Sequence, residues 1–164
     1  MQSLAAFTGA DYQSPGVLDY VNFLRATQMC TNDVREKVLA FERAVFNVAF
    51  NNRDDHPKNF AYLMSPAGDW KLAPAYDVTF CEGPGGYHQM DVLGEALAID
   101  RAGLLRLADE AEVSGERAGI IINQICNVAS QFAVIAEKLY PQVITPETLR
   151  IIQGRIDDNI GLLR

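Results

Sequence analysis

The sequence predicts a mainly α-helical fold, a helical bundle interrupted by one β-hairpin. Apolar residues recur at helical spacing through three long stretches, 34–49, 114–139 and 146–163. Two short β-prone runs flank a turn rich in Pro, Gly and Asp, which is typical of a hairpin. With 164 residues, of which 49% are hydrophobic and 21% charged, the chain is expected to form a single domain over residues 1–164.

The first half of the chain predicts two helices. Residues 1–13 show no clear period, but Ser14-Pro15-Gly16 reads as an N-cap followed by Pro at the first helical position. The helix that follows should end before Thr31. Thr31 or Asn32 can cap a second helix over 34–49, where apolar residues step by three and four. This second helix leads directly into a polar loop at residues 51–59.

The predicted hairpin follows the polar loop. Its strands are Phe60–Met64 and Trp70–Pro74, and the turn between them is Ser65–Asp69. Because a hairpin returns the chain to its starting point, it should bring the polar loop and Asp77 to the same end of one ribbon.

The second half of the chain predicts helices only. Asp100 can cap a helix that runs to about Ala111, and Ser114 can cap a long one whose apolar stripe extends to Leu139. This long helix is expected to lie at the centre of the core and to stop at Pro141. A last helix should open at Thr145-Pro146 and run to about residue 163, which gives five or six helices in all.

Charge, hydropathy and cysteine usage exclude several classes of protein. A net charge of −7 and a pI near 4.7 argue against direct binding to nucleic acid. No apolar run approaches the roughly 18 to 20 residues needed to span a bilayer, and the N-terminus lacks the features of a secretory signal. Cys30, Cys81 and Cys126 are far apart, with no CxxC spacing, so neither disulfides nor a zinc site is expected. The cytoplasm is the expected compartment.

The polar loop and the segment after the hairpin carry side chains of the kinds used in catalysis and metal binding. Asp54 and Asn59 stand five apart, and Asp77 follows the hairpin. A carboxylate that accepts a proton, with an amide and a second carboxylate as oxygen ligands, is the set that Mg²⁺-dependent phosphoryl transfer needs. On its own, an Asp and an Asn at this spacing are more often turn residues of a solvated loop. Their position between a long helix and a hairpin favours the functional interpretation.

The neighbouring residues each have a structural alternative. His56 is more often a hydrogen-bonded brace of such a loop than a proton carrier. Lys58 would ordinarily lie on the surface, but beside Asn59 it could neutralise a terminal phosphate. Tyr76 is as well explained by packing as by contact with a nucleotide.

Three strings together closely resemble the C-terminal part of the HipA family, serine/threonine kinases that are the toxin half of bacterial toxin–antitoxin modules. The strings are DDHPKNF at 54–60, WKLAPAYDV at 70–78 and GGYHQMD at 85–91. The resemblance extends through nearly all of the 164 residues. It implies a kinase-like C-lobe, a helical bundle in which one β-hairpin carries the catalytic and metal-binding loops.

The resemblance also implies a role for each matching residue. The Asp that opens the loop is catalytic in the family, and here it is Asp54. Asp55 stands where some members carry Gly, and the five-residue step to Asn59 favours Asp54 as the proton acceptor. Mg²⁺ would be bound by Asn59 and Asp77. The residues expected to contact ATP are His56, Pro57, Lys58, Asn59, Tyr76 and Asp77.

Two functions remain open at the level of sequence. A kinase of this type needs an N-lobe with a glycine-rich loop and a Lys that pairs with the phosphates, and the N-lobe is absent from these 164 residues. The chain is therefore expected to be the C-lobe of a Mg²⁺- and ATP-dependent protein kinase, inactive without its N-lobe. The alternative is a non-catalytic interaction module that serves an antitoxin-type partner. The implied partners are an N-lobe, a helix-turn-helix antitoxin and a protein substrate.

Overall fold

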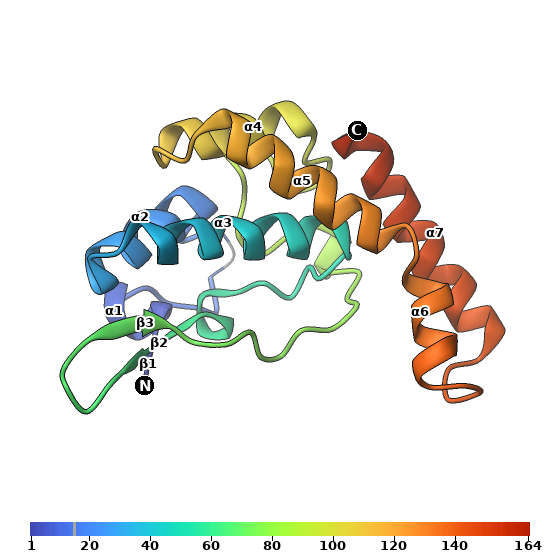
Figure 1. Ribbon diagram of the computed structural model, residues 1–164, viewed down its shortest axis with the longest axis horizontal. Helices are drawn as coiled ribbons and strands as arrows, with labels where there is room; N and C mark the ends of the chain where they lie inside the picture. Colours follow the sequence, from blue (N-terminus) through green and yellow to red (C-terminus); the bar gives the residue numbers. More distant parts are fainter. Residues whose placement is uncertain (15) are drawn as a thin grey trace.

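Helix α3 (Val34–Ala49) is the element around which the others pack. The computed structural model describes residues 1–14 and 16–164, and over these α3 contacts α2, α5, α7 and the sheet (Figure 1). The mainly helical prediction is confirmed. The other elements are β1 (Gln2–Ser3), α1 (Leu4–Thr8), α2 (Tyr20–Thr31), the 3-10 helix η1 (Pro57–Asn59), β2 (Ala61–Met64), β3 (Trp70–Leu72), the 3-10 helix η2 (Pro84–Gly86), α4 (Arg101–Glu110), α5 (Gly115–Ala129), α6 (Phe132–Leu139) and α7 (Pro146–Leu163).

The N-terminal region differs from the prediction. Helix α2 begins at Tyr20, where the Asp19 carboxylate accepts a hydrogen bond from the Asn22 amide at 2.6 Å. The predicted start at Ser14-Pro15-Gly16 is wrong, since Ser14 and Gly16 lie in turns; Pro15 is outside the described residues. Strand β1 and helix α1 were not predicted, because two and five residues are too few to show a period.

Helix α3 spans the predicted range, but its cap is the next residue along. The Asp33 carboxylate accepts from the Arg35 amide at 2.9 Å, whereas Asn32 takes a left-handed conformation that ends α2. One face of α3 is fully buried in the core through Phe41, Ala44 and Val45. Its length and burial make α3 the fixed support from which the polar loop emerges.

The sheet confirms the hairpin and adds a strand to it. Strands β2 and β3 pair antiparallel, with Tyr62 opposite Leu72, and β1 pairs with the other edge of β2. The buried carboxylate of Glu36 accepts a hydrogen bond from the Leu72 amide at 2.9 Å. Because an unpaired buried carboxylate would be costly, this bond fastens the sheet to α3.

The long helix expected over 114–139 is two helices. Helices α5 and α6 meet at a bend of 54°. At the bend the Ser130 hydroxyl donates to the Asn127 carbonyl at 2.9 Å, and the Ala133 amide donates to the side chain of Gln153 in α7. At the bend, a backbone amide near the start of α6 thus has a hydrogen-bond acceptor on α7. Among the described residues no single helix is long and apolar enough to cross a membrane, and α5 with α6 reaches that length only across the bend.

The helices are not equally covered. Figure 1 shows α2, α3, α4 and α5 stacked together, with the sheet at one end of the molecule. At the other end α6 and the start of α7 extend away from this stack (Figure 1). None of the residues of α6 is buried.

Two isoleucines in α5 test which face of that helix stabilises the fold. Ile122 is fully buried, whereas Ile125 is half-buried and lines a surface groove. An unpaired carboxylate at Ile122 should cost about 3 to 5 kcal/mol of unfolding free energy. Ile125→Asp should cost less, about 1 to 2 kcal/mol. Urea denaturation followed by circular dichroism measures both, and equal losses would contradict the packing of α5.

Candidate active site

The polar loop at residues 51–59 is tied to three separate parts of the chain. Asn52 donates from its side chain to the Asn47 side chain of α3 at 3.0 Å. Asn51 accepts at its side-chain oxygen from Asn159 of α7 at 3.2 Å. The Arg53 amide donates to the Cys81 carbonyl at 3.2 Å. Because these anchors come from different directions, the loop has a defined conformation although its regular structure is limited to the short 3-10 helix η1.

Arg53 also fixes the glycine-rich segment that follows Cys81. Its guanidinium donates to the Gly86 carbonyl. Gly83 has a φ of 68°, and a Cβ there would lie 2.3 Å from the Tyr87 carbonyl oxygen. Only glycine fits this approach, so the segment can fold back over Arg53.

Asp55 is the buried centre of the site. It has no exposed surface, and its two oxygens accept three hydrogen bonds. The Tyr20 hydroxyl donates at 2.5 Å, His88 Nδ1 at 2.8 Å and the Gln89 amide at 2.7 Å. These bonds join α2, the polar loop and the 85–91 segment. Asp55 is therefore a structural anchor, because its oxygens are already engaged by fixed donors.

Tyr20 extends this buried network to α3. Its hydroxyl accepts a hydrogen bond from the Asn47 side chain at 3.0 Å while donating to Asp55. Burial first, and then the Asp55 charge, raise the pKa of Tyr20 well above its ordinary value. The phenol therefore remains a protonated donor at neutral pH.

Asp54, in contrast, points to solvent. Its side chain is 42% exposed, and His56 Nε2 lies 3.8 Å from its carboxylate. The Asp54 carbonyl accepts a hydrogen bond from the Asn59 side-chain amide at 2.8 Å. That bond engages the nitrogen of the Asn59 amide and does not involve its side-chain oxygen. Of the two adjacent carboxylates, only Asp54 is accessible to a substrate.

The hairpin brings the second half of the predicted site to the loop. The Tyr76 hydroxyl donates to the Lys58 carbonyl, which fastens the end of the hairpin beside η1. Asp77 comes next and is exposed, with a left-handed φ of 52°. A positive φ is uncommon for a residue other than Gly, although Asp tolerates it better than most. Tyr76 is thus tied to Lys58 of the polar loop, and the close approach of Asp77 to Asn59 stays a prediction.

Lys58 and His56 share a neighbour that the sequence did not indicate. The Lys58 ammonium lies 3.5 Å from the centre of the Tyr12 ring, and the His56 ring lies 5.8 Å from it. Lys58 is also the main cause of a lowered pKa at Tyr12. Pro57 is buried as the first residue of η1. Lys58 is therefore held by an aromatic ring, and His56 packs against the same ring while its buried Nδ1 has no hydrogen-bond partner among the described residues.

The match to a known family settles what kind of domain this is. The family model for HipA-like C-terminal domains matches residues 1–132. The chain belongs to this family. No curated protein matches the chain.

A solved HipA structure has the same fold. It comes from the complex of HipA, HipB and operator DNA of the toxin–antitoxin system of Shewanella oneidensis MR-1. The TM-score is 0.69 at 18% sequence identity, over 88% of this chain and 34% of that HipA chain. This HipA-like domain thus spans about a third of the solved relative's length.

Sequence reasoning missed the residues that hold the site. The sequence gives Tyr20 no role beyond its place in a predicted helix, and it marks His88 and Gln89 only as part of the string GGYHQMD. The available signal was the presence of a His and a Gln between glycines and an apolar residue, in a segment otherwise too irregular to be a helix or strand. Their partner Asp55 could not be identified without knowing which of two adjacent carboxylates faces inward.

The two carboxylates should respond differently to removal of their charge. Asp55→Asn places an amide NH₂ group against fixed donors and should lower the unfolding free energy by about 2 to 4 kcal/mol. Asp54→Asn changes an exposed group and should stay within about 0.5 kcal/mol of the parent. Chemical denaturation measures both variants. A large loss of unfolding free energy in Asp54→Asn with none in Asp55→Asn would show that Asp54, not Asp55, is the structural anchor.

Proposed function

We propose that the chain is the C-terminal lobe of a Mg²⁺- and ATP-dependent protein serine/threonine kinase of the HipA toxin type. The observation that carries this proposal is that Asp54 is accessible while the adjacent Asp55 is buried. Beside the accessible Asp54, the Asn59 side chain is held by a bond from its nitrogen, and the Tyr76–Lys58 bond ties the residue before Asp77 to the same loop. These are the groups that phosphoryl transfer needs from a C-lobe.

Asp54 is the proposed catalytic residue. A serine or threonine hydroxyl that attacks a phosphate must be oriented and must lose its proton, and an exposed carboxylate on a fixed loop can do both. Asp55 is unsuited to this role because its oxygens are buried and engaged by Tyr20, His88 and Gln89. The structure thus supports the assignment that the five-residue spacing favoured.

Asn59 and Asp77 are the proposed Mg²⁺ ligands. They offer one amide oxygen and one carboxylate, which suits an ion that keeps several waters and binds substrate phosphates. Within residues 1–14 and 16–164, no cluster of three or more His, Cys, Asp or Glu side chains could hold a metal by itself. When bound, the ion would offset charge that develops on the phosphates. The left-handed backbone at Asp77 supports a functional role, because such conformations concentrate at active sites.

The proposed ATP contacts are His56, Pro57, Lys58, Asn59, Tyr76 and Asp77. Lys58 is the cation among them, and to reach a phosphate it would have to leave or share the Tyr12 ring. Tyr76 would act mainly through the bond that positions η1. The phosphate-covering loop and its Lys would come from an N-lobe, since this chain spans 34% of the solved HipA.

An antitoxin is the proposed protein partner. The solved HipA was crystallised with HipB and operator DNA. A net charge of −7 makes this domain a poor ligand for DNA, so contact with DNA would be made by the partner. We place such a complex in the cytoplasm, where its operator and its protein substrates would be found.

A second function is favoured by the complex in which the solved HipA is found. HipA occurs there with HipB, and a HipA-like domain that binds such a partner and transfers no phosphate is an interaction module. Nucleotide binding separates the two functions. A kinase lobe should bind Mg²⁺ with ATP at the loop, and an interaction module should not.

We expect the isolated chain to have no measurable kinase activity, because the N-lobe supplies much of the positioning on which phosphoryl transfer depends. Incubation with labelled ATP and protein substrates measures this. Labelling that disappears in Asp54→Ala would contradict the expectation and would show that the domain is catalytic alone.

Nucleotide binding should be weak and should depend on Asp77. Mg²⁺ alone should shift the amide resonances of residues 54–59 and 76–78 very little, and Mg²⁺ with ATP should shift them more, because phosphates complete the coordination. Asp77→Asn should weaken binding about tenfold or more. Asp69→Asn, at an exposed position of the hairpin turn, is the matched control. The absence of any shift at these amides with ATP and Mg²⁺ would favour the interaction module.

A further inference from the structure

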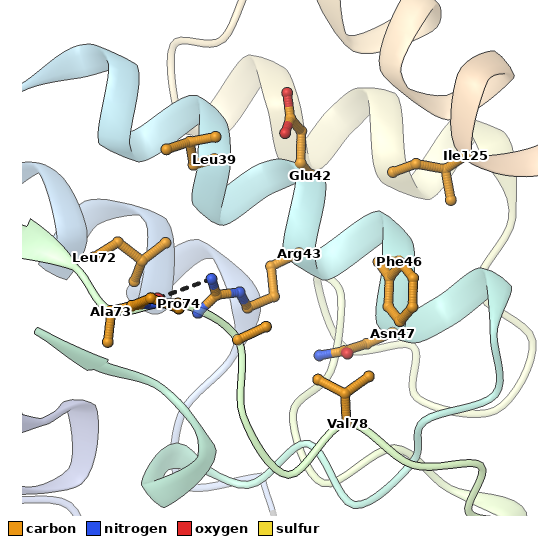
Figure 2. Close-up of a pocket in the computed structure, with 11 residues that line it drawn as sticks. Leu39, Glu42, Arg43, Phe46, Asn47, Leu72, Ala73, Pro74, Val78 and Ile125 are labelled. Atoms are coloured by element: carbon orange, nitrogen blue, oxygen red, sulfur yellow. Dashed lines mark hydrogen bonds between the residues drawn. The ribbon is translucent and has the colours of Figure 1, made fainter. Parts of the chain in front are cut away.

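A continuous apolar groove runs along the outer face of α3. It consists of three adjoining hollows of about 500, 190 and 240 Å³, all lined in part by Phe46. We call this surface the α3 groove and define it by Leu39, Phe46, Phe50, Val78, Ile125 and Val128. Figure 2 shows its largest hollow between α3, α5 and the segment after β3. An open groove lined mainly by apolar side chains is a candidate interaction surface.

Two charged residues of α3 lie in the groove beside its apolar wall. Arg43 donates from one guanidinium nitrogen to the Ala73 carbonyl at 3.0 Å (Figure 2). Its other terminal nitrogen is buried and has no partner among the described residues. Glu42 lines the same hollow. A complementary occupant should therefore present apolar side chains together with one anionic and one cationic group.

The same chain carries an uncovered apolar helix. We call residues 132–143, comprising α6 and the turn after it, the α6 arm. Val134 is 71% exposed, Leu139 is 63% exposed and Val143 is 74% exposed. Phe132 at the start of the arm packs against Phe50 of the groove in the same chain, with the ring centroids 6.2 Å apart, whereas the rest of the arm contacts α7 and extends away from the helical stack (Figure 1). Most of it also lies beyond the residues that match the family model, 1–132.

The charges of the α6 arm complement those of the α3 groove. Lys138 is one helical turn after Val134 and shares its outward face, and Glu137 is adjacent. Lys138 can pair with Glu42, and Glu137 can supply the carboxylate that Arg43 lacks. Both Glu137 and Lys138 are exposed in the single chain.

We propose that two copies of this chain associate by placing the α6 arm of each in the α3 groove of the other. A two-fold arrangement is favoured because it fills both grooves and covers both arms, which leaves no arm available to extend a fibre. Two such contacts can reach the size of a standard protein interface, whereas one helix of eight residues alone would be marginal. This inference is independent of the proposed kinase function.

Sedimentation velocity of the 164-residue chain tests the association. Between roughly 5 and 500 µM the weight-average mass should rise from monomer towards dimer, which is the range for a modest interface. A monomer at every concentration would overturn the proposal. So would assembly that continues beyond the dimer, because a closed two-fold contact cannot grow.

Single substitutions on either surface should weaken the dimer. Leu39→Asp in the groove and Val134→Asp on the arm should each raise the dissociation constant at least about tenfold. Both positions are exposed in the monomer, at 45% and 71%, so the fold should survive, as circular dichroism would confirm. Met29→Asp is the matched control, since Met29 is 77% exposed on α2 and lies outside both surfaces. Equal weakening by Met29→Asp, or no weakening by Leu39→Asp, would contradict the proposal.

Mixing the two variants distinguishes groove–arm contact from contact between two arms. The Leu39→Asp chain keeps an intact arm and the Val134→Asp chain keeps an intact groove, so the mixture should form a heterodimer with one native contact. Where one substitution is enough to abolish a contact, each variant homodimer keeps no native contact, so the heterodimer should be more stable than either of them. Association between two arms predicts no such recovery, so a mixture no more stable than the two variant homodimers would contradict the proposal. As a second check, Lys138→Glu should weaken the dimer and Glu42→Lys in the same chain should restore it.

Discussion

The buried carboxylate of Asp55 is the constraint on which the rest of the site depends. A carboxylate without exposed surface must be matched by donors, and here the donors come from α2, from a loop imidazole and from a backbone amide. Satisfying Asp55 therefore fixes the relative positions of three segments that are distant in the sequence. With Asp55 held inward by these donors, its neighbour Asp54 lies at the surface, where its side chain is 42% exposed.

Much of the architecture could be predicted because it depends on local chemistry. The apolar stripe on α3 follows from the spacing of its apolar residues, and the turn between β2 and β3 follows from its Pro, Gly and Asp residues. The bend between α5 and α6 could not be predicted, because it depends on Gln153 reaching the Ala133 amide from another helix. Strand β1 exists only because β2 offers it an edge.

The candidate site shows the same limit. The pattern of Asp54, Asn59 and Asp77 suggested its chemistry, and the hairpin explained how two parts of the chain could meet. The pattern could not show which atom of Asn59 is available, since that follows from a bond to a backbone carbonyl. Nor could it show Tyr12 against Lys58, because the contact joins an irregular segment to a loop far along the chain.

Helix α7 connects two regions that have different surroundings. Its C-terminal half is embedded through Ile156, Ile160 and Leu163, and Asn159 in that half holds Asn51 at the start of the polar loop. Its N-terminal half carries the Gln153 contact to α6. An α-helix of 18 residues is a stiff rod about 27 Å long. A force that displaces α6 is thus transmitted along α7 to Asn159 and, through its bond with Asn51, to the loop that carries Asp54.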